Sequence, residues 1–388
     1  MAIRNRFAEL QGEIAGWRHD FHAHPELRFE EHRTAARVAE LLRGFGCDEV
    51  VEGFGETGVV GVIHGKANGS GKVMGFRADM DALPIEEATN LPYASKTAGT
   101  MHACGHDGHT SMLLGAAKYL AETRNFDGTL VLAFQPAEEG GGGARAMLEA
   151  GLVDRWGVQE FYGMHNWPGL PVGEFAVKDG PLLASPDKFE ITVRGRGGHG
   201  AMPQAAVDST LVAAQIVVAL QSIASRNVSP LKSVVVSVCG LRSGTDTYNV
   251  IPDEVFMRGT VRTYDKDVQE LVRARIDALA TATAAAYGAT AQVSYTEGPP
   301  ALINHVREAE FAAQAAEAVA GKVTREFDSS MGGEDFAEML RAKPGCYVLI
   351  GNGDSAGLHN PGYEFNDEAI PFGASFYAEM AEKRMPLG

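Results

Sequence analysis

The chain has 388 residues, more than one hydrophobic core usually supports, so we expect two domains. Lys and Arg number 34 and Asp and Glu number 50, and the resulting net charge of −16 argues against nucleic acid or an anionic membrane as a partner. The polar N-terminal segment lacks the apolar core of a secretory signal, and no run of about eighteen apolar residues occurs. We therefore expect a cytoplasmic protein without a membrane-spanning helix.

The first part of the chain, residues 1–186, alternates between helical and strand-like patterns. Apolar residues recur at helical spacing from Phe7 to Phe21, and a second helix is expected over 30–44. Strand-like runs follow at 58–65, 72–84 and 130–134, and a further run ends at His165. This alternation predicts an open α/β sheet.

The middle part, residues 187–299, has a different order of elements. A strand, a long helix, two strands, a second long helix and a last strand follow one another, which is the β-α-β-β-α-β order of a ferredoxin-like domain. Helix and strand patterns then resume over 300–388. The predicted fold is therefore an open mixed α/β catalytic domain, made of 1–186 and 300–388, that is interrupted by a ferredoxin-like domain.

The stretch Thr100–Thr110, with the sequence TMHACGHDGHT, concentrates potential metal ligands ahead of a helix expected over 112–120. Cysteine thiolate and neutral imidazole suit zinc and related divalent metals. The alternative is a solvated histidine loop. Spacing alone does not choose His106 over His102 or His109 as a ligand.

Residues of ligand type also follow several predicted strands, where open α/β sheets place their sites. These positions hold carboxylates and histidines: Asp79, Asp81, Glu138, Glu139, His165 and His359. Together with Cys104 and His106 they exceed the four ligands of one zinc ion, so we expect a two-metal centre. Two cations that share a water, with a carboxylate as the base, indicate metal-assisted hydrolysis of an amide or ester.

Other polar residues have structural interpretations. Helix capping is favoured for Glu334 and Asp335, which precede a helix-like segment. His199 lies in a glycine-rich turn, where a structural and a functional role have equal weight. Four histidines flank the junction of the first two helices and are interpreted as surface or junction residues: His19, His22, His24 and His32.

Motifs that span nearly the whole chain occur in this order: RADMDALP, HACGHDGH, PAEEGGGGA, GMHNWP, GRGGHGAMP, YNVIPD, MGGEDF and LHNPGYEFND. Together they resemble the N-acyl-amino-acid amidohydrolase group of metallopeptidases. This group includes hippurate hydrolase and the plant auxin-conjugate hydrolases, within the wider aminoacylase and carboxypeptidase G superfamily.

The resemblance implies two divalent metal ions per subunit, manganese or zinc, with cobalt or nickel as alternatives. The implied ligands, with the thiolate as a potential bridge, are Cys104, His106, Glu139, His165 and His359. Glu138 is implied as the general base and acid. The wider superfamily has a histidine two residues before a supporting aspartate, where this chain has Asp79 before Asp81. We therefore expect Asp81 to support the metal site, and the role of Asp79 stays open.

For the inserted domain, the resemblance implies a lid that also forms a homo-oligomer, either a dimer or a tetramer. His199 would help to hold the oxyanion of a facing active site, in the same subunit or across the dimer. Asn249 and Arg262 would contact the substrate, and a guanidinium is well suited to bind its carboxylate.

The function implied is hydrolysis of a small N-acyl amino acid to a carboxylic acid and a free amino acid. One alternative is a dipeptidase or carboxypeptidase that uses the same two metals, and another is a hydrolase of indole-acetyl amino acid conjugates. A third alternative is a metal-binding homologue that does not catalyse a reaction. The presence of Glu138 argues against this alternative.

Overall fold

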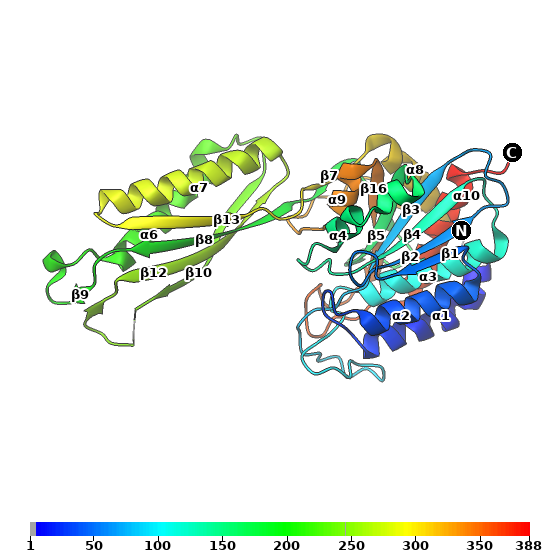
Figure 1. The fold of residues 1–388 in the computed structure, drawn as a ribbon, viewed down its shortest axis with the longest axis horizontal. Helices are drawn as coiled ribbons and strands as arrows, with labels where there is room; N and C mark the ends of the chain where they lie inside the picture. Colours follow the sequence, from blue (N-terminus) through cyan, green and yellow to red (C-terminus); the bar gives the residue numbers. More distant parts are fainter. Residues whose placement is uncertain (1–4, 245) are drawn as a thin grey trace. The chain divides into compact units, whose positions relative to one another are not determined.

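The structure, a computed structural model, describes residues 5–244 and 246–388 (Figure 1). The expected fold class is confirmed: an open mixed α/β sheet with helices is interrupted by a β-α-β-β-α-β segment. The chain divides into two compact units. The first unit contains the large sheet and the second contains the inserted segment.

The division of the chain differs in detail from the expected boundaries after residues 186 and 299. The second unit comprises 183–302 together with 329–334, a segment that was expected in the catalytic part. Backbone pairing explains this grouping, because the Ala184 N–H donates to the carbonyl of Gly332 at 2.8 Å. The first unit comprises the remaining described residues, and the chain crosses between the units within β7 (Gly180–Leu183) and β14 (Leu302–Asn304).

The sheet of the first unit has eight strands in the order β1-β2-β4-β3-β5-β16-β6-β15. In chain order they are β1 (Glu49–Glu52), β2 (Val59–His64), β3 (Val73–Asp79), β4 (Thr129–Gln135), β5 (Glu160–Pro168), β6 (Phe175–Ala176), β15 (Val323–Thr324) and β16 (Gly345–Gly353). β4, β3, β5 and β16 are parallel neighbours, whereas β2 pairs with β4, and β6 with β16, in antiparallel fashion. The carboxyl ends of the four parallel strands therefore meet at one edge.

Five long helices share one hydrophobic core with this sheet: α1 (Asn5–Ala23), α2 (His32–Phe45), α3 (His106–Thr123), α8 (Val306–Ala320) and α10 (Ile370–Arg384). α3 contacts α1, α2, α10 and β3, so it is buried along most of its length. Three short helices complete the unit: α4 (Gly143–Glu149), α5 (Leu152–Trp156) and α9 (Phe336–Ala342). A 3-10 turn, η3 (Asp367–Ala369), leads into α10.

The second unit has a four-stranded antiparallel sheet in the order β10-β12-β8-β13. Its strands are β8 (Ser185–Arg194), β10 (Val234–Ser243), β12 (Glu254–Thr263) and β13 (Thr290–Thr296). Burial alternates along β8, as expected of a sheet with one covered face, and α6 (Ser209–Ser222) and α7 (Lys266–Ala286) fill the core on that face. A small pair joins β9 (Gly198–His199) to β11 (Val250–Ile251), and η1 (Pro203–Ala205) and η2 (Ile223–Asn227) flank α6.

Two local expectations were wrong. The stretch Thr100–Thr110 is not a loop throughout, because α3 begins at His106 rather than near Met112. The strand expected to end at His165 continues to Pro168, since β16 pairs with it over this length. Both differences arise because neighbouring elements extend regular structure beyond the local sequence pattern.

One helical stretch of the described residues, Ser209–Asn227, is long and apolar enough to cross a membrane, whereas the sequence analysis expected none. Its inward side chains, among them Val212, Ile216 and Leu220, belong to the core of the second unit. Core helices of globular domains share this length and composition, so a single such helix carries little weight for a membrane span.

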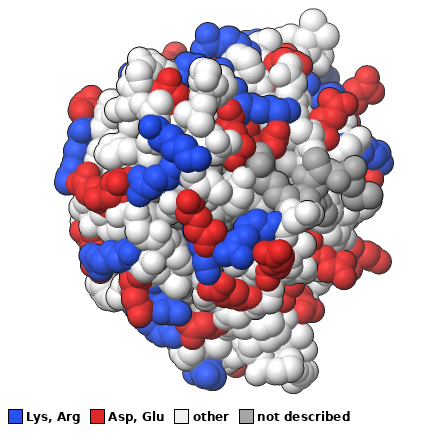
Figure 2. All heavy atoms as spheres, turned by 90° about the vertical axis from the view of Figure 1, so that its right-hand side faces the viewer, with Lys and Arg blue, Asp and Glu red and all other residues white. Residues whose placement is uncertain are grey.

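Charges of both signs are interspersed over the face of the first unit that Figure 2 shows. Surface ion pairs such as Arg124 with Asp48, at 2.7 Å, and Arg155 with Glu49, at 2.5 Å, belong to this unit. Among the described atoms on that face no broad basic patch is seen.

Candidate metal centre

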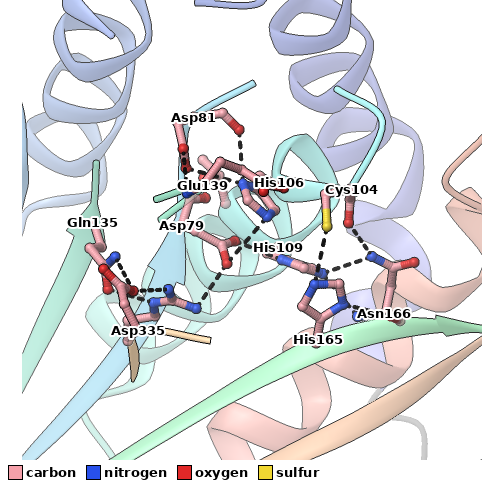
Figure 3. Close-up of polar contacts among 12 residues, drawn as sticks. Asp79, Asp81, Cys104, His106, His109, Gln135, Glu139, His165, Asn166 and Asp335 are labelled. Atoms are coloured by element: carbon pink, nitrogen blue, oxygen red, sulfur yellow. Dashed lines mark hydrogen bonds and ion pairs between the residues drawn. The ribbon is translucent and has the colours of Figure 1, made fainter. Parts of the chain in front are cut away.

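Cys104 lies just before the point where the chain enters α3. The intervening Gly105 has a φ of 85°, a left-handed conformation that glycine adopts without strain, and His106 is the first helical residue. Cys104 is buried, and its Sγ lies 3.4 Å from Nε2 of His165 (Figure 3). Burial raises the pKa of the Cys104 thiol, so a neighbouring cation is needed to hold the thiolate.

Hydrogen bonds fix the orientation of two imidazoles beside Cys104. Nδ1 of His106 donates to the backbone carbonyl of Asp81 at 2.8 Å, and Nε2 is buried without a hydrogen-bond partner. Nδ1 of His165 donates to the carbonyl of Asn166 at 2.7 Å, which leaves Nε2 directed at the sulfur. In the neutral rings both Nε2 atoms are unprotonated, which is the state that binds a metal.

The other two histidines of the stretch differ. Nδ1 of His109 donates to Asp79 at 2.7 Å, and Nε2 accepts the backbone N–H of Asn166 at 2.9 Å, so both nitrogens are engaged. His102 is buried, and burial lowers its pKa to about 3, so its ring is neutral. His102 belongs to none of the potential ligand groups among the described residues. His109 does share a further group of potential ligands with Asp79 and His106. What distinguishes His106 from His109 is its Nε2, which has no hydrogen-bond partner.

Glu138 and Glu139 follow β4 in a turn that begins with Ala137, a non-glycine residue with a φ of 51°. The backbone N–H of Glu139 donates to Oδ2 of Asp81 at 2.9 Å, so Asp81 contacts the backbone of Glu139 as well as the ring of His106. Oε1 of Glu139 is buried and lies 3.1 Å from Nε2 of His359. The turn therefore presents a carboxylate oxygen toward a histidine of another loop.

His359 lies in the loop after β16 and also has a positive φ, of 63°. Its backbone N–H donates to the carbonyl of Ala103 at 2.8 Å, which brings the loop to Cys104. Nε2 of His359 lies 3.1 Å from Oε1 of Glu139. Hydrogen bonding to Cys104 and Glu139 raises the pKa of His359 to about 10, so the surroundings favour positive charge.

Five groups of potential ligands occur among the described residues, and two of them share Cys104. One group is Cys104, His106 and His165, and the other is Cys104, Glu139 and His359, with the donor atoms of each group within 4.8 Å of one another. A third group adds the remaining glutamate: His106, Glu138 and Glu139. Nε2 of His106 is buried with no hydrogen-bond partner, and its nearest carboxylate oxygen, of Asp79, is 3.6 Å away. This nitrogen fits a cation held at this place, because buried polar atoms otherwise have partners.

Asp79, whose role the sequence left open, is part of a buried ionic network. It accepts from Nη1 of Arg77 at 2.8 Å, and Arg77 also donates to Asp335 at 3.2 Å. Helix capping was expected of Asp335, but its side chain makes no capping hydrogen bond to its own helix. Its carboxylate instead accepts from the side chain of Gln135 at 2.7 Å and from the backbone N–H of Ala144, in the first turn of α4, at 3.0 Å.

The sequence analysis missed a buried tether between α1 and the first turn of α3. His22, interpreted from the sequence as a surface or junction histidine, is buried with Nδ1 2.9 Å from Asp107 and Nε2 3.3 Å from Glu87. Arg18 donates to the same oxygen of Asp107 at 3.1 Å. Burial lowers the pKa of His22, but these carboxylates outweigh it and raise the pKa to about 9. The four-residue spacing of Ile14, Arg18 and His22 on the apolar face could have revealed them.

The residues expected to contact substrate lie in the second unit. His199 on β9 pairs with Val250 of β11, and the backbone carbonyl of Asn249 accepts from the N–H of Gly200 at 2.7 Å. Both side chains are exposed. The backbone N–H of Ala201 donates to Nδ1 of His199 at 3.1 Å, so Nε2 carries the proton of the neutral ring.

Arg262 lies on β12 and is half-buried. Its Nε donates to the carbonyl of Met331 at 3.1 Å, and Nη1 donates to the carbonyl of Val261 at 3.1 Å and to the hydroxyl of Thr260. Burial lowers the pKa of Arg262 from its ordinary value. The side chain is therefore held by neutral oxygens, which leaves its charge available to an anionic group.

Comparison with known proteins shows the family to which the chain belongs. The model of peptidase family M20/M25/M40 matches residues 75–383. A hippurate hydrolase from Campylobacter jejuni is 44% identical over 377 residues, which cover 97% of each chain, and an N-acetylcysteine deacetylase from Bacillus subtilis is 42% identical over 95% of this chain and 96% of its own. The solved structure of the YXEP protein from Bacillus subtilis, a dinuclear metal binding peptidase from the M20 family, matches with a TM-score of 0.85 and 38% identity, over 97% of this chain and 99% of that one. The chain belongs to peptidase family M20/M25/M40, as its motifs indicated, and it is a hydrolase.

Proposed function

We propose that this protein is a metal-dependent amidohydrolase that cleaves N-acyl amino acids to a carboxylic acid and a free amino acid. The observation that carries the proposal is the pair of three-residue groups that share Cys104. Family membership supports the class of reaction. The similarity to a hippurate hydrolase and to an N-acetylcysteine deacetylase supports the class of substrate.

Each group of potential ligands would hold one divalent cation, with the Cys104 thiolate as the shared donor. The dinuclear site of the Bacillus subtilis relative supports two cations. Sulfur, imidazole and carboxylate donors suit zinc, cobalt and nickel, and manganese remains a candidate because the carboxylate and imidazole donors also accept it. Three protein ligands per cation leave coordination positions open, as catalytic sites require.

Glu138 would act as the base and then as the acid. When bound, two divalent cations supply Lewis acidity, which lowers the pKa of a water and stabilises negative charge on the substrate carbonyl oxygen. Glu138 would take a proton from the attacking water and deliver it to the leaving nitrogen. Asp81 would act through its contacts with His106 and Glu139, which hold these ligands in place.

Recognition of the substrate would involve the second unit. His199 would donate from Nε2 to the oxyanion, because its Nδ1 already accepts a backbone N–H. Asn249 and Arg262 would contact the carboxylate or the scissile region of the substrate. A homo-oligomer formed through this unit would let His199 act within its own subunit or on the active site of a partner subunit. The cytoplasmic location expected from the sequence stays a prediction.

A dipeptidase or carboxypeptidase is the second candidate, because the matching family model describes peptidases. The same centre would serve that reaction, and only the preferred substrate would differ.

The decisive experiment is a substrate panel on apo-protein that has been reconstituted with one metal at a time. The panel contains N-acetyl, N-benzoyl and indole-acetyl amino acids beside dipeptides. We expect N-acyl amino acids to be cleaved fastest, and chelators to remove the activity. Faster cleavage of dipeptides would favour the peptidase, and an active protein that contains no metal would overturn the proposal.

A further inference from the structure

Asn166, on β5, contacts two of the residues proposed as metal ligands, Cys104 and His165. Its side-chain Nδ2 donates to the backbone carbonyl of Cys104 at 2.6 Å and lies 3.0 Å from Nε2 of His109. Its backbone carbonyl accepts from Nδ1 of His165 at 2.7 Å (Figure 3). One residue therefore joins the turn that carries the sulfur to the strand that carries an imidazole.

The space around this asparagine amide is closed on its other side. The hydroxyl of Tyr363 donates to Oδ1 of Asn166 at 2.7 Å, and both residues are buried. A side chain at Gly105 would overlap the amide nitrogen and lie 2.5 Å from this hydroxyl. The amide is therefore held in one orientation, with its donor group toward Cys104 and its acceptor toward Tyr363.

The same residue also decides which imidazoles stay available. The backbone N–H of Asn166 donates to Nε2 of His109, and Nδ1 of this ring donates to Asp79, so both of its nitrogens have protein partners. The backbone carbonyl of Asn166 fixes Nδ1 of His165 as the protonated nitrogen, which leaves Nε2 facing the sulfur of Cys104 at 3.4 Å. Partners of this kind orient metal ligands and set their basicity.

We propose that Asn166 is a positioning residue of the metal centre, which sets the separation of the Cys104 sulfur and the His165 ring. The inference rests on the proposed function, since it takes both residues as ligands. The amide acts through the backbone of Cys104, and the backbone carbonyl acts through the ring of His165. Loss of the amide should loosen the turn that holds the sulfur and so weaken binding of the cations.

The test is a titration of apo-protein with cobalt, followed by the thiolate-to-cobalt charge-transfer absorption and by metal analysis. Asn166→Leu removes the amide without adding charge. Asn304→Leu is the matched control, because Asn304 is also buried and bonded at both ends of its amide, to the backbones of Lys178 and Tyr347. We expect about 10–100-fold weaker cobalt affinity and a weaker absorption for Asn166→Leu alone, with a similar loss of thermal stability in both variants.

A milder variant, Tyr363→Phe, removes only the hydroxyl that donates to Oδ1 of Asn166. It tests the positioning role of Asn166 if Asn166→Leu does not fold. It should weaken cobalt affinity by less than Asn166→Leu does, and wild-type affinity and absorption in the folded variants would overturn the inference. If the wild-type protein itself binds no cobalt through a thiolate, the proposed function fails instead.

Discussion

The candidate metal centre of the first unit and the His199 region of the second unit are built in opposite ways. In the centre, Cys104 and His106 are buried, and the ring of His106 is fixed by a hydrogen bond to Asp81. Around His199 and Asn249 the side chains are exposed, and the short β9–β11 pair fixes mainly the backbone. The difference teaches that buried neighbours fix the side chains proposed as ligands, whereas His199 and Asn249, proposed to meet substrate, are left accessible.

Burial has a consequence for each region. A buried ligand that changes leaves its partners unsatisfied, so its replacement should affect metal binding and stability together. An exposed side chain has few partners to lose, so its replacement should affect only the reaction. The predictions below test this contrast, from the largest expected effect to the smallest.

Cys104→Ser should reduce hydrolysis to background and lower the metal content below two ions per chain. The reason is that both groups of potential ligands depend on the same sulfur. Metal analysis and turnover with an N-acyl amino acid measure this. Cys239→Ser, at an exposed thiol on β10, is the control and should retain both properties. A Cys104→Ser protein that keeps two cations would show that the sulfur is not shared.

Glu138→Gln should lower kcat by about 10³-fold, because it removes the proton acceptor, and should leave the metal content unchanged. Steady-state kinetics and metal analysis on the same preparation check this. Glu122→Gln, which alters a surface pair between Glu122 and Arg6, serves as the matched control. Normal hydrolysis by Glu138→Gln would assign the base to another residue.

His199→Ala should lower kcat/KM by about 10²-fold while metal content and Tm stay at their wild-type values. The side chain is exposed, so no buried partner is lost. The exposed Gln204 lies in the adjacent 3-10 turn, and Gln204→Ala is the control. Mixing His199→Ala subunits with Glu138→Gln subunits should restore activity if the histidine acts across a dimer. A fall in metal content of His199→Ala would contradict the contrast between the two regions.

The smallest effect concerns stability. The folded-state pKa of His22 is raised to about 9 from 6.5. The contribution of His22 to the free energy of unfolding is therefore complete below about pH 6.5 and is lost as the pH rises through about 9. The contribution is up to about 3 kcal/mol. In denaturant unfolding between pH 6 and 10, the free energy of unfolding of His22→Gln should therefore fall less with pH than that of the wild type. His32→Gln, at an exposed histidine of α2, is the control, and its free energy of unfolding should fall with pH as that of the wild type does.

Much of the architecture followed from the sequence alone. Helical spacing from Phe7 to Phe21 lies within α1, and the order of patterns over 187–299 gave the fold of the second unit, because period and element order are local properties. The convergence of strand ends at one edge also followed, since the carboxyl ends of parallel strands meet.

The choice among chemically equal residues needed the tertiary structure. His102, His106 and His109 have the same side chain within eight residues, and only their partners from other elements separate them. The same holds for Asn166, which the sequence did not single out. Hydrogen-bond partners distant in the chain are set by how strands and helices pack, so spacing determines which residues can be ligands, and packing determines which nitrogen remains free.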